Sequence, residues 1–534
     1  MDEHYLYPDS ELRRAWELVC LNQFHDILPG SSIGPVYTES LEQYAEVKRI
    51  GDKLRKTALS VIAQFAISDL PTTARKKDSM PLNSTRNSDD LRHLLLVNPT
   101  PWSRCDLAFW PGGKIENRAW RKPDGSPVTI QPVDGGLLLD IGCLGPYSLA
   151  VLKASLEKAK INRTGPTTTD MTATGATTST LENNFLLVEF SEEGDITRIY
   201  DKETGREVLP SNELANQFQL FEDRPRSPDA WEIDIYYDDK MWLAEPAESI
   251  TVVENGPLRA AVEIRRNVSH STLVQRISIA HNSPRLDFDT VIHWREKHML
   301  LKVAFPVAIL SPSATYEIQW GNVQRPTHRN TSWDWARFET CAHKWVDLSE
   351  GGYGVSLLND CKYGHDIQEN VIRLTLLRAT TDPDPEADQG EHHFVYSLLP
   401  HAGSWGELTM SEAYMLNDPI FVYEPNPSPE ALTQSNENPD LIQRPFVTVD
   451  MPNVIVETIK GAENGLGIIV RLYESQRRRG PVTLTTAFPL ADAWQTNLLE
   501  ENQEQLAIDE NQLHMTIKPY QIMTLRLLPG DERS

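Results

Sequence analysis

Cysteine is scarce in this sequence of 534 residues. The five cysteines are odd in number and widely spaced, and no two of them form a C-x-x-C pair. This pattern predicts reduced, mostly buried thiols rather than a disulfide framework, and it argues against a zinc site built from thiolates. The cysteines are Cys20, Cys105, Cys143, Cys341 and Cys361.

Positive charge and long apolar runs are also lacking. Lys and Arg total 51 against 76 Asp and Glu, which gives a net charge of −25. A chain with this much negative charge is not expected to bind nucleic acids or anionic membranes, because these bind basic surface patches. No apolar run is long enough to cross a bilayer, and the opening "MDEHYLYPDS" lacks the basic and apolar regions of a secretory signal peptide. We therefore expect no nucleic-acid or membrane partner, and synthesis in the cytoplasm.

Sequence motifs of two large enzyme groups are missing as well. The chain contains no P-loop, no other Gly-rich phosphate loop and no G-x-S-x-G elbow. Nucleotide-dependent and serine-hydrolase chemistry therefore lack support. The chain is also too long for one ordinary hydrophobic core, so two or more domains are expected.

The first seventy residues have the periodicity of helices. Leu12, Trp16, Val19 and Cys20 recur at helical spacing. A second helix is predicted to begin near Pro35, because proline suits the first helical turn. Two helices alone make a poor domain, so this segment is typical of part of a larger helical bundle.

The remainder of the chain has the texture of β-strands. Short apolar segments such as "FLLVEF", "LRAAVEIRR" and "LDFDTVIHW" alternate with turn-forming residues. This predicts a mainly β fold, in which a short N-terminal helical segment precedes large antiparallel β-sandwich domains. The expected segments are 1–70 (partial helical domain), 71–92 (linker), 93–180 (small β region with a Thr-rich loop), 181–425 (large β-sandwich) and 426–534 (C-terminal β-sandwich).

The stretch "LNQFHDILPGSSIG" places His25 and Asp26 between an apolar helix-like run and a turn. Histidine is a common zinc ligand, but a metal site needs three or four ligands from different segments. Locally, the pair also fits a structural role, in which His25 complements a helix C-terminus and Asp26 caps the next turn.

Two further segments combine charged and aromatic residues. In "EDRPRSPDAWEIDIYY", Asp229 and Trp231 suit a sugar, because carboxylates bind hydroxyls and an aromatic face packs on the ring. The alternative there is an acidic surface loop with one buried tryptophan. In "EIQWGNVQRPTHRNTSWDWARFE", Arg325 and His328 suit a ligand-facing loop, or alternatively a hydrogen-bonded core of stacked Arg and Trp.

A third segment, "LRATTDPDPEADQGEHHF", contains the adjacent histidines His392 and His393. Neighbouring residues of a strand point to opposite faces, so the two imidazoles cannot easily share one metal ion. This segment therefore predicts a structural polar loop.

In order along the chain, these segments resemble a known family, the α-mannosidases of glycoside hydrolase family 38, most closely the fungal cytosolic or vacuolar type. "LNQFHDILPGSSI" resembles the signature of the family's middle helical domain, part of a three-helix unit. "LLVNPTPWSR", "FQLFEDRPRSPDAWEID", "PDPEADQGEHHFVYSLLPH" and "VIVETIKGAENG" resemble successive segments of its β-rich C-terminal part. The resemblance covers nearly the whole chain and adds the vacuole as an expected destination.

The resemblance implies retaining hydrolysis of terminal α-linked mannose in oligosaccharides. It implies one divalent ion, usually Zn²⁺, held by two histidines and two aspartates, of which His25 is one ligand. Asp26 is expected to bind a sugar hydroxyl beside the ion. The further substrate-binding residues expected at the rim of the same pocket are Asp229, Trp231, Arg325 and His328.

In this family the H-x-D ligand pair, the aspartate nucleophile and the general acid lie in an N-terminal α/β domain that would precede residue 1. We therefore expect no catalytic residue in this chain, weak zinc binding, and no hydrolysis without that domain as a partner. The resemblance also implies a homo-oligomer for the full-length protein. The alternative is a carbohydrate-binding or scaffold β-sandwich protein without catalysis.

Overall fold

The computed structural model of the protein describes residues 6–68, 92–114, 119–155, 174–226, 229–425 and 444–530. Nearly all of the predicted linker and most of the Thr-rich loop lie outside these residues. Within the described residues, no helix is both long and apolar enough to cross a membrane. The chain divides into unit 1, Met1–Arg55 with Arg163–Asn417, and unit 2, Lys56–Asn162 with Asp418–Ser534.

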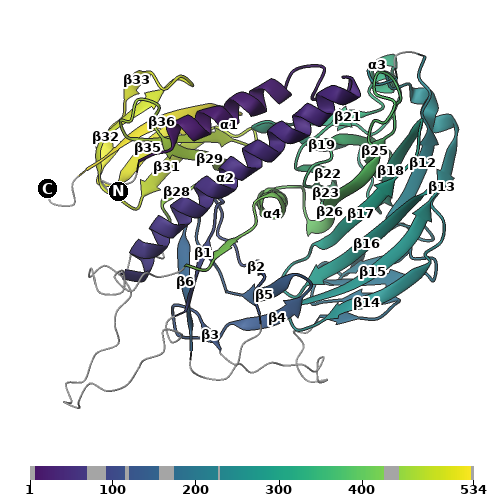
Figure 1. The fold of residues 1–534 in the computed structure, drawn as a ribbon, viewed down its shortest axis with the longest axis horizontal. Helices are drawn as coiled ribbons and strands as arrows, with labels where there is room; N and C mark the ends of the chain where they lie inside the picture. The colour runs from purple at the N-terminus through teal and green to yellow at the C-terminus, as the bar shows by residue number, and fades with distance from the viewer. Residues whose placement is uncertain are drawn as a thin grey trace. The chain divides into compact units, whose positions relative to one another are not determined.

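Two helices, α1 (Asp9–Asn22) and α2 (Gly34–Ser68), open the chain, and antiparallel sheets follow, as the expected mainly β class requires (Figure 1). The helices run antiparallel. Asn22, at the end of α1, donates to Gln43 (2.6 Å), whereas Glu11, near its start, pairs with Lys53 (2.8 Å). Pro35 is the second residue of α2, so the predicted start of this helix is confirmed.

Much of the apolar surface of this helix pair is exposed. The buried residues of α1 are Leu18 and Asn22, whereas Trp16, which the periodicity placed on an apolar face, is 65% exposed. Further exposed apolar side chains on the helices and the turn between them are Leu21, Phe24, Leu28, Ile33, Leu41 and Tyr44. Exposed apolar surface of this extent is typical of an interaction site.

Unit 1 contains three antiparallel sheets among its described residues, with five, six and nine strands (Figure 1). Their orders are β11-β10-β9-β8-β7, β13-β12-β18-β25-β24-β21 and β14-β15-β16-β17-β26-β23-β22-β19-β20. The elements are β7 (Gly175–Ala176), β8 (Thr180–Glu182), β9 (Leu186–Phe190), β10 (Ile196–Asp201), β11 (Arg206–Glu207), β12 (Gln217–Glu222), η2 (Ile235–Asp239), β13 (Met241–Leu243), β14 (Ser249–Asn255), β15 (Arg259–Val268), β16 (Ser271–Ala280), β17 (Leu286–Trp294), β18 (Met299–Pro306), β19 (Ser313–Ile318), β20 (Gly321–Pro326), α3 (Ser332–Ala336), β21 (Thr340–Cys341), β22 (Trp345–Glu350), β23 (Tyr353–Asn359), β24 (Gly364–Gln368), β25 (Val371–Arg378), β26 (Gly390–Ala402) and α4 (Glu407–Asn417).

Side chains from all three sheets meet in one large apolar core. Strand β17 illustrates why, because its residues alternate between buried and more exposed positions with the period of two that a strand imposes. Phe288 lies directly opposite Tyr396 in the β17–β26 register, and their rings stack with centroids 4.9 Å apart. The alternation directs one face of the sheet into the core.

A closed group of hydrogen-bonded polar side chains lies within this core. Gln275 donates to Thr290 and to Tyr396 (2.8 Å each), and the Tyr396 hydroxyl donates to Asn216 (2.8 Å). Asn216 donates back to Gln275 (2.7 Å). Because these buried groups satisfy one another, the cost of removing them from water is offset, and strands β16, β17 and β26 are held in one register.

Helix α4 packs against β22 and β23 over a second buried polar group. The ring of His401 bonds to the carboxylate of Asp347 (2.8 Å), and the Ser356 hydroxyl donates to the same carboxylate (2.8 Å). Ser356 also hydrogen-bonds to Thr409 of α4 (3.0 Å). Gly354 lies so close to His401 that a Cβ atom there would overlap the imidazole ring.

Unit 2 contains four antiparallel sheets among its described residues. Their orders are β27-β1-β6-β3, β2-β5-β4, β28-β31-β35-β34 and β29-β30-β36-β32-β33. The strands are β1 (His93–Val97), β2 (Ala108–Pro111), β3 (Trp120–Arg121), β4 (Thr129–Val133), β5 (Gly136–Asp140), β6 (Leu149–Ala154), β27 (Phe421–Tyr423), β28 (Val447–Val449), β29 (Val454–Gly461), β30 (Ile468–Glu474), β31 (Gly480–Thr486), β32 (Leu490–Thr496), β33 (Asn502–Gln505), β34 (Ile508–Asp509), β35 (Gln512–Ile517) and β36 (Ile522–Pro529).

The cores of unit 2 are smaller and separate. The last turns of α2 place Ala63 and Ala66 against Leu95 of β1 and Val151 of β6. The β1–β6 region and the β2-β5-β4 sheet share another apolar cluster. The two C-terminal sheets enclose a third, to which β30, β31 and β36 each contribute fully buried residues. Each sheet thus buries one face, as a sandwich requires.

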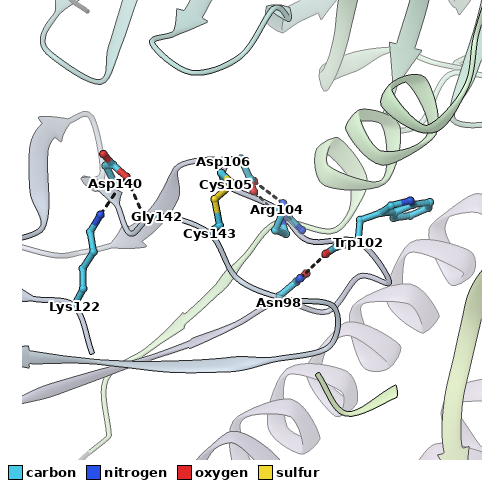
Figure 2. Close-up of a disulfide and its surroundings, with 9 residues drawn as sticks. All are labelled: Asn98, Trp102, Arg104, Cys105, Asp106, Lys122, Asp140, Gly142 and Cys143. Atoms are coloured by element: carbon cyan, nitrogen blue, oxygen red, sulfur yellow. Dashed lines mark hydrogen bonds and ion pairs between the residues drawn. A yellow bond between two sulfur atoms is a disulfide. The ribbon is translucent and has the colours of Figure 1, made fainter. Parts of the chain in front are cut away.

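The prediction for the cysteines is wrong in two respects. Cys105 and Cys143 form a disulfide (Figure 2), with Cα atoms 4.0 Å apart. The remaining cysteines are exposed rather than buried. The two partners are 38 residues apart in sequence. They become neighbours because Arg104 and Leu144 pair across an antiparallel bridge. A long-range pairing of this kind cannot be read from cysteine spacing.

Replacing Gly354 with alanine is expected to destabilise the protein by roughly 1–3 kcal/mol, because the added methyl group would overlap the buried His401 ring and the Ser349 hydroxyl. Urea unfolding followed by circular dichroism measures the change. Gly352→Ala is the matched control, since a Cβ at Gly352 meets no atom within 4 Å. Equal midpoints for the two variants would contradict the packing described here.

Acid is expected to destabilise the fold through His365 of β24. This histidine is completely buried, its Nδ1–H donates to the Tyr363 carbonyl oxygen (3.1 Å), and burial lowers its pKa from 6.5 to about 4. Between these pH values the unfolded chain binds a proton that the folded chain does not. Stability should therefore fall as the pH decreases from 6.5 to 4, by as much as roughly 3 kcal/mol.

The measurement is urea unfolding at several pH values for the wild type and for His365→Gln, in which this part of the pH dependence should disappear. His514→Gln is the control, because the side chain of His514 is 58% exposed. A variant at His365 that keeps the full acid dependence would show that other groups cause it.

Candidate functional site

His25 and Asp26 lie in the turn that joins α1 to α2. The His25 side chain is 77% exposed, and its Nε2 atom is 3.4 Å from Oδ2 of Asp26, whose side chain is 37% exposed. Both side chains are accessible. Asp26 also has a structural part, because its carboxylate contacts Ser31 of the same turn. An accessible imidazole beside a carboxylate can bind a cation or a polar ligand.

The turn that carries this pair is fixed by its own hydrogen bonds. The Ser31 hydroxyl is 3.3 Å from Oδ1 of Asp26, and the Tyr37 hydroxyl donates to the Asp26 carbonyl oxygen (3.3 Å). The same hydroxyl accepts the N–H of Ser32 (2.8 Å). Ser31 is buried, so its contact is shielded from water. These contacts hold the backbone and the carboxylate of Asp26 in place.

Gly34, at the start of α2, brings a distant loop to this turn. A Cβ atom at Gly34 would lie 3.0 Å from Oδ1 of Asp384, which belongs to the "DPDPEADQG" loop between β25 and β26. The Asp384 carboxylate also accepts the N–H of Glu386 (3.0 Å). The segment predicted to be a structural polar loop thus reaches the turn of His25 and Asp26.

Asp229 binds the first residues of the same loop. It is buried, and its two carboxylate oxygens accept the backbone N–H groups of Thr381 (2.7 Å) and Asp382 (2.8 Å). The neighbouring Ala230 N–H donates to the Asp382 carbonyl oxygen (3.2 Å). Trp231 follows and is half exposed. The alternative of an acidic surface loop with a buried tryptophan does not describe these two residues, since the Asp229 carboxylate is buried and the Trp231 indole is accessible.

Arg378 secures the segment around Asp229 from the end of β25. Its guanidinium donates to the Asp223 carboxylate (2.6 Å) and to the Glu232 carbonyl oxygen. Burial raises the pKa of Asp223 despite this pairing.

The backbone contacts of Asp229 and the approach of Asp384 to Gly34 join three segments that are far apart in sequence. We call them the loop junction: residues 25–34, 229–234 and 381–386.

Arg325 and His328 lie together elsewhere in unit 1. They line a small cavity with Arg329, Asp334 and Asp366. Its volume of ≈ 20 Å³ holds about one water molecule and is too small for a sugar ring. None of the other predicted site residues lines this cavity.

A second, larger groove of ≈ 790 Å³ also includes His328 in its lining. It is bordered by the exposed Leu310 and by Glu350 and Glu369. The Glu350 carboxylate already has two protein partners, because it accepts the Leu310 N–H (2.9 Å) and pairs with Arg206 (2.6 Å). The backbone contact and this ion pair lower the pKa of Glu350.

Beneath the small cavity lies a network of buried charges. Lys302 of β18 is completely buried and pairs with Glu339 and Asp366. Although burial alone lowers the pKa of Lys302, these two carboxylates more than offset that effect and raise it. Arg373 binds Asp366 (2.6 Å) and Asp238 (3.2 Å), which extends the network to η2. The network positions the segments on either side of the cavity.

In the part of the chain that the structure describes, no three His, Cys, Asp or Glu side chains are grouped so that they could hold a metal ion. The accessible His25 ring fits the role of a single nitrogen ligand. His392 and His393 have separate partners, the Asp388 carbonyl oxygen (2.7 Å) and the Asp289 carboxylate (2.6 Å). The two imidazoles thus hydrogen-bond to different segments of the chain.

Sequence reasoning missed three residues of this region: Ser31, Tyr37 and Asp384. The sequence "PGSSIG" signalled a turn, but the hydrogen bonds that Ser31 and Tyr37 make to Asp26 depend on how that turn closes. The only hint for Asp384 was a small residue, Gly34, in a motif far from it in sequence. Small residues permit close approach, but they do not indicate which segment approaches.

Comparison with known proteins identifies three family domains along the chain. Residues 1–62 match the "Alpha mannosidase middle domain", residues 181–386 the "Glycosyl hydrolases family 38 C-terminal domain", and residues 453–525 the "Glycosyl hydrolases family 38 C-terminal beta sandwich domain". Alpha-mannosidase 2C1 of Mus musculus is 34% identical over 532 residues, and Alpha-mannosidase G of Dictyostelium discoideum is 32% identical over 539 residues.

These matches cover 98% of the present chain but 46% and 48% of the two relatives, so the chain spans about half the length of the curated relatives it matches. Among solved structures, an alpha-mannosidase from Enterococcus faecalis is similar with a TM-score of 0.75 at 18% identity. That match covers 98% of this chain and 64% of the other. At this identity it supports the fold alone.

Replacing Asp229 with alanine is expected to loosen the loop junction, because two backbone N–H groups lose a charged acceptor. The expected loss of stability is roughly 2–3 kcal/mol. Hydrogen exchange should quicken at Thr381 and Asp382. Asp229→Asn should lose less, because one oxygen remains as an acceptor.

Glu386→Ala is the control for this prediction. The Glu386 side chain is 72% exposed and its ion pair with Lys297 faces solvent, so little change is expected. Unaltered exchange at Thr381 and Asp382 in Asp229→Ala would show that the carboxylate does not hold this loop.

Proposed function

The chain belongs to glycoside hydrolase family 38, and we propose that it forms the middle and C-terminal part of a retaining, zinc-dependent α-mannosidase. Its substrates would be oligosaccharides with terminal α-linked mannose. The order of the three matched domains supports this proposal, as do the relatives named as α-mannosidases. The observation that carries it is the accessible His25–Asp26 pair, which the family match places in the middle domain.

In the proposed site, His25 would hold the zinc ion through one ring nitrogen and Asp26 would accept a hydrogen bond from a mannose hydroxyl. When bound, zinc would act as a Lewis acid that coordinates sugar hydroxyl groups. The hydrogen bonds of Ser31 and Tyr37 keep the turn rigid, so that little ordering is needed when sugar binds. Trp231, half exposed within the loop junction, would offer an aromatic face to the sugar ring.

Asp229 would act at this site by positioning the loop that contains Thr381 and Asp382. Its direct contact with sugar stays a prediction. Arg325 and His328 line a different, small cavity. Their proposed part in substrate binding therefore concerns a larger oligosaccharide that extends beyond the loop junction, in agreement with the groove that includes His328.

The remaining zinc ligands, the nucleophile and the general acid would come from the family's N-terminal catalytic domain. The exposed apolar side chains of α1, α2 and the turn between them support a partner of this kind, because such a surface is stable when another domain covers it. The length of the relatives supports it as well. The proposal also includes a homo-oligomer for the complete protein, synthesis in the cytoplasm, and a vacuolar destination.

The 534-residue chain alone is expected to leave an aryl α-mannoside unhydrolysed in the presence of zinc, because retaining glycosidases need two catalytic carboxylates. Co-expression with the N-terminal catalytic domain of the family should give zinc-dependent turnover, measured by release of the aryl group. His25→Ala should then lower kcat/KM by at least about 100-fold. His514→Ala, at another exposed histidine, should leave turnover unchanged.

Turnover by the chain alone that disappears in His25→Ala would overturn the expectation of inactivity. If the combined protein is inactive but binds mannose-containing oligosaccharides in a calorimetric titration, the carbohydrate-binding alternative is correct. Absence of both activity and binding would favour a scaffold role.

A further inference from the structure

We propose that the Cys105–Cys143 disulfide is a site of reversible thiol–disulfide exchange with a low-molecular-weight thiol. The bond, drawn in Figure 2, joins a residue shortly before β2 to one shortly after β5. It therefore lies beyond the end of the β2-β5-β4 sheet at which β2 begins and β5 ends. Reduction of the bond would loosen the end of the sheet at which β2 begins and β5 ends, and reoxidation would restore it. The surrounding fold would persist in both states. The inference does not depend on the proposed function.

The position of the bond follows from the strand pairing beside it. Arg104 and Leu144 exchange two backbone hydrogen bonds, with N···O distances of 2.9 and 2.8 Å. The next pair in this antiparallel register, Cys105 and Cys143, is of the non-hydrogen-bonded type, in which the Cα atoms lie closest. Their Cα separation of 4.0 Å agrees with this. The backbone thus presents the sulfur atoms to each other.

A turn after β5 brings Cys143 into this register. Gly142 has a φ of +74°, which glycine adopts without strain. Its N–H donates to Oδ1 of Asp140 (3.0 Å), and the ammonium group of Lys122 lies 3.7 Å from the same oxygen (Figure 2). None of these contacts involves sulfur, so the turn does not depend on the disulfide.

Both cysteines are exposed, whereas the flanking Arg104 and Leu144 are buried. A thiol from solvent therefore has access to the sulfur atoms, and exposed disulfides are the labile class. Beneath them, Arg104 forms a bidentate pair with Asp106 and donates to the Asp418 carbonyl oxygen (2.6 Å). These buried contacts should keep the two thiols close after reduction, so that the bond can re-form.

The exchange proceeds in two steps. The thiolate of a small thiol attacks one cysteine sulfur, which breaks the protein S–S bond and forms a mixed disulfide. The other cysteine leaves as a thiolate and takes up a proton from water. A second small thiol then attacks the mixed disulfide, releases the second protein thiol and yields a small-molecule disulfide. Two small thiols thereby supply the two electrons that reduce the protein disulfide.

The disulfide closes a loop of the chain between Cys105 and Cys143, and exchange would control how readily this loop opens. Strands β2, β4 and β5 all lie between Cys105 and Cys143, as do Trp110 and Trp120, whose rings meet edge to face at 5.5 Å. Reduction should therefore increase opening of this sheet. The C-terminal sandwich has its own core and should be unaffected.

Alkylation of the native chain by iodoacetamide, read by peptide mass spectrometry, tests the proposal. After treatment with oxidised glutathione, Cys105 and Cys143 are expected to carry no label, because their sulfur atoms are bonded to each other. After millimolar reduced glutathione without denaturant, Cys105 and Cys143 should be labelled, and reoxidation should protect them again. Amide hydrogen exchange in β2 and β5 should be at least about tenfold faster in the reduced protein.

The double variant Cys105→Ser/Cys143→Ser should show the faster exchange permanently and no response to glutathione. Cys20→Ser should respond as the wild type does. Two results on the wild type would overturn the proposal: labelling of Cys105 and Cys143 despite oxidised glutathione, or resistance of the bond to glutathione until urea is added. Both can be read without the variants, so the test holds even if the double variant does not fold.

Discussion

A buried lysine imposes the strongest constraint on unit 1. Lys302 has no contact with solvent, and an isolated ammonium group in such a place would be prohibitively unstable. Its charge requires Glu339 and Asp366, and Asp366 in turn binds Arg373. Through Asp238 this network reaches η2 and Arg329. Segments that the sequence separates widely are therefore tied to one point in the six-stranded sheet.

The loop junction follows the same physical rule at the level of the backbone. Connecting segments have N–H groups without partners in a sheet, and these groups must find acceptors. Asp229 supplies both of its oxygens to the loop after β25, and the Tyr37 hydroxyl accepts the Ser32 N–H in the turn after α1. A buried carboxylate thus acts as a structural anchor, while the accessible His25 and Trp231 remain available for a ligand.

Local patterns predicted some features of this protein well and others poorly. The start of α2 and the β class were predicted correctly, because proline preferences and strand periodicity act over a few residues. The apolar face of α1 was visible in the sequence, yet Trp16 is exposed, since periodicity does not reveal what covers a helix. The cysteines were misjudged, because their pairing depends on the bridge between Arg104 and Leu144.

The sequence alone established the helical opening, the succession of β-strands and the family resemblance of the His25–Asp26 stretch. These depend on residue order within short windows, where side-chain periodicity and turn chemistry act directly. Only the tertiary structure decided that Asp384 meets Gly34, that Asp229 is an anchor, and that Arg325 and His328 line a separate cavity. The contacts of Asp384 and Asp229 join residues more than 150 positions apart, and such contacts arise when polar groups find partners in the packed fold.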